Sequence, residues 1–321
     1  MKPIVVLYHR GCNDGIVAAW AARRRLGDAA KYIPYQYGEE LPAEVWGSHL
    51  IMVDLSMPEE QLQKVRHEVL SVLIIDHHKT ARPLQAAMRP VKTYQEYLRH
   101  RTDMDQLMIM FDEEHSGAVL AWAFFNDIAR IQQESMPMAL QLIEDYDLWK
   151  HEYPESKAVN AWLINGGLSM DRVEELMSND GEIPAEVLAV GKALLRYDDK
   201  IIKSVLREYV QVIEFDDGTK CAMVNAPHHL RNEIGERLSD KFDFVALYTQ
   251  RKERIVYSLR SKNYDVSKIA EAFGGGGHAQ AAAYSIPNGA QHKLLSRGAF
   301  VKPTFRNRLV AAWDIITGKV A

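Results

Sequence analysis

The sequence predicts an α/β protein of two domains, in which a parallel-sheet domain is joined by a helical linker to a smaller α/β domain. Its first half alternates short, nearly continuous runs of β-branched residues with helical segments, which is typical of βαβ units and a parallel sheet. A long stretch with few helix breakers then leads to a second group of strand-like runs. We expect the first domain at 1–183, the linker at 184–208 and the second domain at 209–321.

The first domain is expected to open with a strand at 3–8, a helix at 15–26 and an edge strand at 31–37. Pro34 argues for the edge because it cannot donate a ladder hydrogen bond in a central strand. The remaining elements expected here are strands at 49–53 and 71–75 and helices at 58–70 and 116–131. Ser116 is the expected N-cap of the last helix.

The second domain mixes strand-like and helical segments after the linker helix. Strands are expected at 208–214, 221–224, 244–248 and 255–259, and helices at 231–242 and 266–273. The sequence shows no internal repeat and no low-complexity tract. We therefore expect a second, smaller α/β domain.

Composition limits the function classes. The chain has 321 residues and a net charge of −4, which gives no support to a protein that coats long duplex nucleic acid with a basic face. Its two cysteines, Cys12 and Cys221, exclude a disulfide framework and fit a reducing cytosol. The first apolar run is too short for a signal peptide, and no run of about 18 apolar residues predicts a membrane span. We expect a cytoplasmic protein without a membrane partner.

Three expected strands of the first domain end in side chains typical of metal sites. These are His9 with Cys12 and Asp14 after the first strand, Asp54 after the second buried run, and Asp76-His77-His78 after the third. Because ligands of open parallel sheets bind beyond the carboxyl ends of the strands, we expect the three groups to meet in one cleft. Asp145, which follows an apolar segment, is a fourth candidate carboxylate.

These residue types suit divalent cations. Carboxylate oxygens bind hard cations, and imidazole favours Mn²⁺ or other transition metals over Mg²⁺. Two ions about 3.5–4 Å apart can activate water and stabilise the leaving oxygen of a phosphate ester, and Asp54 is the candidate bridge between them. Other interpretations stay open, since Asp14 could cap a helix and Asp145 could be solvated. Two histidines directly after a buried strand are harder to explain as packing.

A run of glycines marks the second domain. Gly274 begins the run Gly274-Gly275-Gly276-Gly277-His278, in which the lack of side chains lets backbone N–H groups approach an anion. We expect a helix to follow and to present its N-terminus to that anion, although a flexible loop is the alternative. Arg260 and Ser261 end an upstream strand, and the arginine suits phosphate.

In this order, the residues resemble the motifs of the DHH phosphoesterase superfamily. His9, Asp14, Asp54, Asp76-His77-His78 and Asp145 resemble its four metal-site motifs, and Arg260-Ser261 with the glycine run and His278 resembles the DHH-associated C-terminal domain. The resemblance covers nearly the whole chain and implies two divalent metal ions in an active site between the domains. The superfamily includes enzymes that cleave linear dinucleotides, enzymes that cleave cyclic dinucleotides, and exonucleases.

The resemblance also implies a role for each residue. His9 would bind the first metal, Asp54 both metals, and Asp14, His77 and Asp145 the second. Asp76 would orient His77, and His78 would contact the scissile phosphate. The substrate would be held from the second domain by Arg260, Ser261, Gly275, Gly276, Gly277 and His278.

Two positions depart from the family pattern. Cys12 stands where many relatives have an aspartate, and Ala283 stands where they often have a glycine. A thiolate ligand at Cys12 would bias the site from Mg²⁺ towards Mn²⁺, Fe²⁺ or Zn²⁺, whereas a Cys12 that does not ligate would leave the first metal weakly bound.

The favoured function is therefore Mn²⁺-dependent hydrolysis of linear dinucleotides, such as pGpG or pApA, to nucleoside monophosphates. Cyclic dinucleotides, a bisphosphorylated nucleoside and single strands are alternative substrates, and a nucleotide sensor without turnover is an alternative of another class. Whether the chain forms a homodimer stays open.

Overall fold

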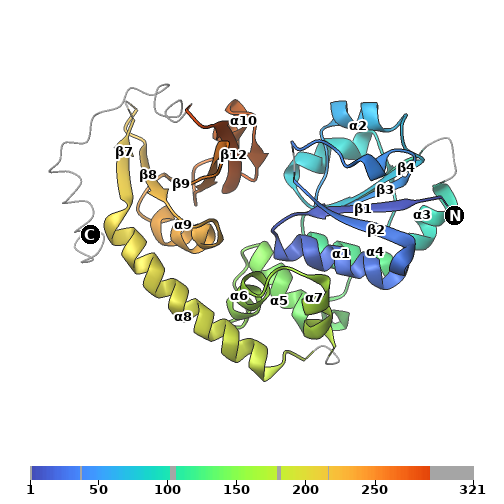
Figure 1. The fold of residues 1–321 in the computed structure, drawn as a ribbon, viewed down its shortest axis with the longest axis horizontal. Helices are drawn as coiled ribbons and strands as arrows, with labels where there is room; N and C mark the ends of the chain where they lie inside the picture. Colours follow the sequence, from blue (N-terminus) through green and yellow to red (C-terminus); the bar gives the residue numbers. More distant parts are fainter. Residues whose placement is uncertain (1, 37, 102–105, 179–181, 216, 290–321) are drawn as a thin grey trace. The chain divides into compact units, whose positions relative to one another are not determined.

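The computed structural model describes residues 2–36, 38–101, 106–178, 182–215 and 217–289. The chain forms two compact units, Met1–Leu195 and Arg196–Ala321 (Figure 1). The bounds expected for the domains and linker remain a prediction, and the end of the second domain lies outside the described residues. Within the described ranges, no helix has the length and apolar character needed to cross a membrane.

The first unit is built on a parallel sheet in the strand order β2-β1-β3-β4-β6-β5, which confirms the predicted sheet. Its strands are β1 (Ile4–His9), β2 (Ala30–Tyr35), β3 (His49–Val53), β4 (Ser71–Asp76), β5 (Arg89–Pro90) and β6 (Leu107–Phe111). β2 lies at an edge, as Pro34 predicts. The sequence did not predict β6, whose Leu-Met-Ile-Met-Phe run contains only one β-branched residue.

Helices cover both faces of this sheet. They are α1 (Asn13–Leu26), η1 (Gly27–Ala29), η2 (Ala43–Val45), α2 (Glu59–Val65), η3 (Lys79–Ala86), α3 (Tyr94–His100), α4 (Gly117–Phe125), η4 (Gln133–Ser135), α5 (Met138–Asp147), α6 (Ser156–Asn165) and α7 (Met170–Met177). In Figure 1, α2 lies on one face and α1 with α4 on the other. Side chains alternate between two cores, so that Ile51 and Val53 face α1 and α4, and Leu50 and Met52 face α2.

Two predicted helices of this unit are shorter than expected. α4 ends at Phe125 rather than at 131, because the chain turns at Asp127, whose φ is 59°. Its beginning is as predicted, since Ser116 caps it by accepting a hydrogen bond from the backbone N–H of Val119. α2 ends at Val65 rather than at 70.

The second unit carries a mixed sheet in the strand order β11-β12-β10-β9-β8-β7. Its strands are β7 (Val210–Glu214), β8 (Lys220–Asn225), β9 (Phe244–Gln250), β10 (Arg254–Arg260), β11 (Gly276–Gly277) and β12 (Ala281–Pro287). Its helical elements are η5 (His228–Leu230), α9 (Arg231–Ser239) and α10 (Ser267–Ala272), while α8 (Ala185–Glu208) spans the division between the units. β8 and β9 are parallel, and the other neighbours are antiparallel.

The helix expected after the glycine run was wrong, because strand β12 follows it instead. Every second residue of β12 packs into the core, where the ring of Tyr284 stacks on Tyr257 at 4.9 Å. The glycines serve close packing against this strand. A Cβ on Gly275 would lie 2.1 Å from the Ala283 carbonyl oxygen, and Gly277 has a φ of 140°.

Candidate functional site

The polar groups predicted at three strand ends do meet in the first unit. β1, β3 and β4 are neighbours in the sheet, so their carboxyl ends lie side by side. β1 ends in His9, Asp54 follows β3 and β4 ends in Asp76. The beginning of α1 adds Asp14, and the end of α5 adds Asp147. We call these residues, with Cys12, His77 and His78, the acidic cluster.

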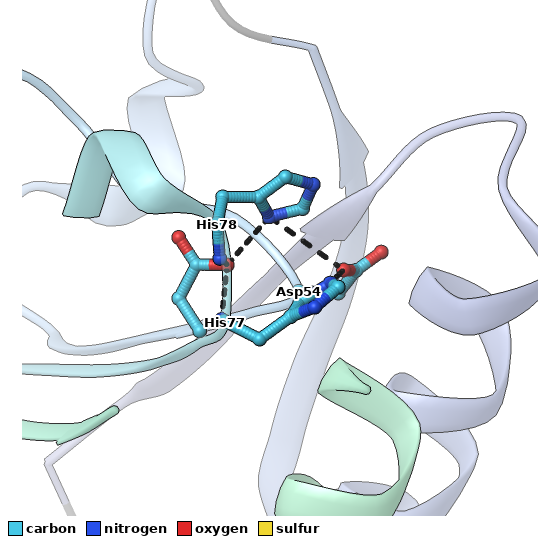
Figure 2. Close-up of side chains that lie close together, drawn as sticks. Asp54, His77 and His78 are labelled. Carbon is cyan, nitrogen blue, oxygen red and sulfur yellow. Dashed lines mark hydrogen bonds and ion pairs between the residues drawn. The ribbon is translucent and has the colours of Figure 1, made fainter. Parts of the chain in front are cut away.

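Asp54 stands between two halves of the acidic cluster. Its Oδ2 lies 3.3 Å from His9 Nδ1, and its Oδ1 lies 3.2 Å from His77 Nε2. Figure 2 shows the rings of His77 and His78 approaching this carboxylate. Asp54 is 1% exposed and has a φ of 56°, a left-handed conformation that Asp adopts more readily than most residues but that still costs free energy. The fold therefore holds one carboxylate so that its two oxygens face different partners.

Each half contains a set of side chains that could hold a cation. His9, Cys12 and Asp54 form one set, and Asp14, His77 and Asp147 form another, with the ligand atoms of each set within 4.8 Å of one another. His77 Nε2 lies 3.8 Å from Asp14 Oδ2 and 3.6 Å from Asp147 Oδ2. The structure thus brings together nearly all of the metal ligands predicted from the sequence.

Asp145 is the exception. It is buried, but its Oδ1 accepts a hydrogen bond from the Glu152 backbone N–H at 2.7 Å, so it is bound to the loop after α5. Asp147, rather than Asp145, approaches His77. Residues two apart on a helix point about 200° away from each other, so only one of the two can face the cluster. The Asp145-Tyr146-Asp147 segment signalled a carboxylate but not which one.

Asp76 acts differently from the expectation. Its Oδ1 accepts a hydrogen bond from the His77 backbone N–H at 2.8 Å and lies 2.7 Å from His78 Nδ1. The carboxylate therefore fixes the ring of His78, whereas its hydrogen bond to His77 goes to the backbone.

The charges of the acidic cluster are unbalanced. Burial and the neighbouring Asp54 raise the pKa of Asp14 and of Asp147. Burial lowers the pKa of His77, but its hydrogen bond to Asp54 and the nearby carboxylates outweigh burial and raise it to about 10. The buried Oδ2 atom of Asp14 accepts no hydrogen bond from any described residue. Carboxylates that resist ionisation and a buried oxygen without a donor both fit divalent cations.

Cys12 lies in the half that contains His9. Burial and the charges of Asp54, Asp147 and Asp14 raise the pKa of its thiol well above the ordinary value, so without a cation the sulfur stays protonated. Cys221, the other cysteine, is a buried core residue of the second unit, and both are free.

Gly117 is a site residue that the sequence analysis missed. A Cβ there would lie 2.6 Å from Asp54 Cβ and 2.8 Å from Asp14 Oδ2. Its absence lets the N-terminus of α4 reach the cluster, where the Ala118 backbone N–H donates to Asp14 Oδ1 at 3.1 Å. A glycine directly after an N-cap serine was the available signal.

The substrate residues predicted in the second unit lie near one another. Arg260 pairs in register with Ala281, and the Ser261 backbone N–H donates to the Gln280 carbonyl. His278 stands in the turn between β11 and β12. The Ser261 hydroxyl, however, donates to the Asp243 carbonyl and accepts from two backbone N–H groups, so it shapes the turn after β10.

A basic cluster accompanies Arg260 and was missed by the sequence analysis. Arg231 Nη1 lies 2.8 Å from His228 Nδ1, and Arg260 Nη2 donates to Asn232 Oδ1 at 2.7 Å. Burial, followed by the charges of Arg231, Arg251 and Arg260, lowers the pKa of His228 to about 3. We call His228, Arg231, Arg251 and Arg260 the basic cluster; it is suited to an anion.

Comparison with known proteins matches the second unit to a known domain. Residues 208–298 match the model of the DHHA1 domain, and the Asp-His-His motif at the end of β4 lies in the acidic cluster of the other unit. The chain is thus similar to DHH proteins in its second unit by this domain match and in its first unit by this motif. A solved DHH-domain structure, from a protein described as a member of a family of ribosomal proteins, has a similar fold. It aligns over 99% of this chain and 86% of its own, at 13% identity and a TM-score of 0.51.

Two curated sequences are similar to this chain. An uncharacterised protein of Acanthamoeba polyphaga mimivirus is 27% identical over 86% of this chain and 66% of its own length. Oligoribonuclease NrnB of Bacillus subtilis (strain 168) is 23% identical over 80% of this chain and 65% of its own length. The matches thus span just under two thirds of each curated relative.

Proposed function

We propose that this protein is a metal-dependent phosphodiesterase that hydrolyses short linear nucleotides, foremost dinucleotides, to nucleoside monophosphates. The observation that carries the proposal is the position of Asp54, whose two carboxylate oxygens face the two ligand sets of the acidic cluster. Such a shared carboxylate is what a pair of closely spaced cations requires. Similarity to an oligoribonuclease supports a nucleotide as the substrate.

The ligand assignment follows from the two sets. His9, Cys12 and Asp54 would hold one cation, and Asp14, His77 and Asp147 would hold the other together with Asp54. When bound, the cations would supply positive charge that lowers the pKa of a nucleophilic water and stabilises the phosphoryl oxygens. The thiol of Cys12 is a softer donor than a carboxylate, and with the imidazoles it favours Mn²⁺ over Mg²⁺.

His78 is the proposed contact to the scissile phosphate. Asp76 holds its Nδ1 at 2.7 Å and thereby fixes the ring orientation. Burial lowers the pKa of His78, but the charge and hydrogen bond of Asp76 raise it above the ordinary value. A protonated imidazole in a fixed orientation can donate from Nε2 to an oxygen that gains charge in the transition state.

The basic cluster is the proposed holder of a second phosphate. Arg231 and Arg260 present guanidinium groups, which pair with phosphate oxygens through two parallel hydrogen bonds. His278 and the Gly275–Gly277 backbone stay candidates beside them. A dinucleotide with a terminal phosphate carries two phosphate groups, one to be hydrolysed and one to be recognised, which is why we favour it over a substrate with a single phosphate.

A hydrolysis assay with added Mn²⁺ tests the proposal. The panel contains a linear dinucleotide with a 5′-phosphate, the same dinucleotide without it, a cyclic dinucleotide, a bisphosphorylated nucleoside and a longer oligoribonucleotide. We expect the phosphorylated dinucleotide to be cleaved with the highest kcat/KM, with mononucleotides as products. Faster cleavage of the cyclic or bisphosphorylated compound would reassign the substrate, and binding without cleavage of any compound would contradict hydrolysis.

A further inference from the structure

The loop that joins α5 to α6, residues 148–155, follows Asp147 of the acidic cluster along the chain and exposes two aromatic residues. Trp149 is 38% exposed, and His151 is exposed beside it, with the ring centroids 5.7 Å apart. Tryptophan has a large apolar ring with a polar N–H at one end, which suits a contact with a ligand at the surface. The loop begins directly after Asp147, a proposed metal ligand.

Both rings are carried by residues in a strained backbone conformation. The φ of Trp149 is 57° and that of His151 is 54°, in the left-handed region that bulky side chains avoid. Strain of this kind persists where the surrounding structure enforces it and is concentrated in segments that clamp ligands. Two strained residues separated by a single residue indicate that this loop is held in one particular conformation.

Two buried carboxylates hold the loop. Asp145 Oδ1 accepts a hydrogen bond from the backbone N–H of Glu152 at 2.7 Å. The backbone carbonyl oxygen of Asp145 accepts another from the backbone N–H of Lys150 at 3.0 Å. Glu144 Oε1 accepts a hydrogen bond from Lys150 Nζ at 3.2 Å. Asp145 therefore stabilises the loop conformation that presents Trp149 before any ligand binds, which gives this residue a role other than the metal ligation expected from the sequence.

We propose that Trp149, with His151 beside it, is a stacking surface for a nucleobase whose phosphate lies at the acidic cluster; the inference rests on the function proposed above. Trp149 follows Asp147 by two residues, so their Cα atoms are at most about 7 Å apart. A ribose between a base and a phosphate bridges a distance of this order, so a base on a nucleotide whose phosphate lies at the cluster is of the size to reach this loop. Because every base has a π-face, stacking on tryptophan predicts binding of a nucleotide with little preference among bases.

Calorimetric binding of two phosphates in the presence of Mn²⁺ tests the stacking surface without turnover. Adenosine 5′-monophosphate carries a base and ribose 5-phosphate does not. We expect Trp149→Ala to weaken the affinity for adenosine 5′-monophosphate about tenfold and to leave ribose 5-phosphate unchanged. Trp149→Phe should restore most of the affinity. Trp46→Ala is the matched control, because Trp46 is a 47% exposed tryptophan after η2 and should affect neither ligand.

Two results would overturn the inference. One is a wild-type protein that binds adenosine 5′-monophosphate no more tightly than ribose 5-phosphate. The other is an equal loss of affinity for both ligands in Trp149→Ala, which would show damage to the phosphate site rather than loss of stacking. Failure of the proposed function looks different, since it would appear as absent hydrolysis across the substrate panel while base-dependent binding through Trp149 persists.

Discussion

The two units concentrate charge of opposite sign by similar means. In the first unit, burial and neighbouring carboxylates raise the pKa values of Asp14 and Asp147. In the second unit, burial and neighbouring guanidinium groups lower the pKa of His228 to about 3. Both arrangements cost free energy in the absence of a ligand, because like charges gather where water is partly excluded. Each unit is therefore prepared for a ligand that the other would repel.

The two clusters differ in what surrounds them. The acidic cluster has a buried centre, in which Asp14, Asp54 and Asp76 are each at most 1% exposed, and a glycine at 117 keeps α4 close. The basic cluster is only partly buried, and its Arg260 and Arg231 already contact protein acceptors. We conclude that the acidic cluster is suited to small cations without their water, and the basic cluster to an anion that remains partly solvated.

The largest expected effect is at the carboxylate that faces both ligand sets. Asp54→Asn should lower kcat for dinucleotide cleavage by at least about 10³-fold, because one amide oxygen cannot serve two cations. Asparagine also tolerates the left-handed conformation that residue 54 requires, so the fold should survive. Turnover in Mn²⁺ and circular dichroism measure the two expectations, and a folded variant with near wild-type turnover would remove Asp54 from the site.

A pair of aspartates two residues apart on α5 sharpens the comparison further. Asp147→Asn should lower kcat about 10²-fold or more by removing a ligand. Asp145→Asn should stay within about fivefold of wild type, because the amide oxygen can still accept the Glu152 N–H. Single-turnover rates and Mn²⁺ affinity of the two variants distinguish them. The reverse order would return Asp145 to the ligand set.

This pair of aspartates also shows which parts of the site can be predicted from the sequence. Strand ends can be predicted because buried apolar runs stop abruptly at Asp54 and Asp76. The order of the parallel strands then brings these ends together. Asp147 was not legible, since the rotation of a helix about its axis depends on packing against α6 and α4 rather than on the local sequence. The same holds for β12, where an alanine-rich segment is a strand because Tyr284 and Ile286 have a core to fill.

Metal removal should have an intermediate effect that depends on pH. Asp14, Asp147 and His77 all bind protons more tightly in the folded state than when unfolded, so the stability they contribute to the metal-free protein is lost as pH rises. Mn²⁺ takes the place of those protons. We expect the rise in Tm on adding Mn²⁺ to be larger at pH 8 than at pH 5.5, measured by thermal unfolding against a sample in EDTA. An equal rise at both pH values would contradict the coupling.

The smallest expected effect concerns the basic cluster, where the sign is reversed. His228 has a folded-state pKa of about 3, below its ordinary value of 6.5, so the unfolded chain binds the additional proton between these pH values. Stability from this residue is therefore present above pH 6.5 and is lost as the pH falls towards 3. His228→Gln keeps an acceptor for Arg231 but cannot be protonated, so it should lose less stability than wild type between pH 7 and pH 4.5 in urea unfolding.

Phosphate makes this last experiment specific to the basic cluster. An anion beside Arg231 and Arg260 would offset their charge and make protonation of His228 less costly. Inorganic phosphate should therefore narrow the difference between wild type and His228→Gln at pH 4.5, whereas the same ionic strength supplied as chloride should narrow it less. If the two salts act alike, general screening explains the effect, and the basic cluster is not selective for phosphate.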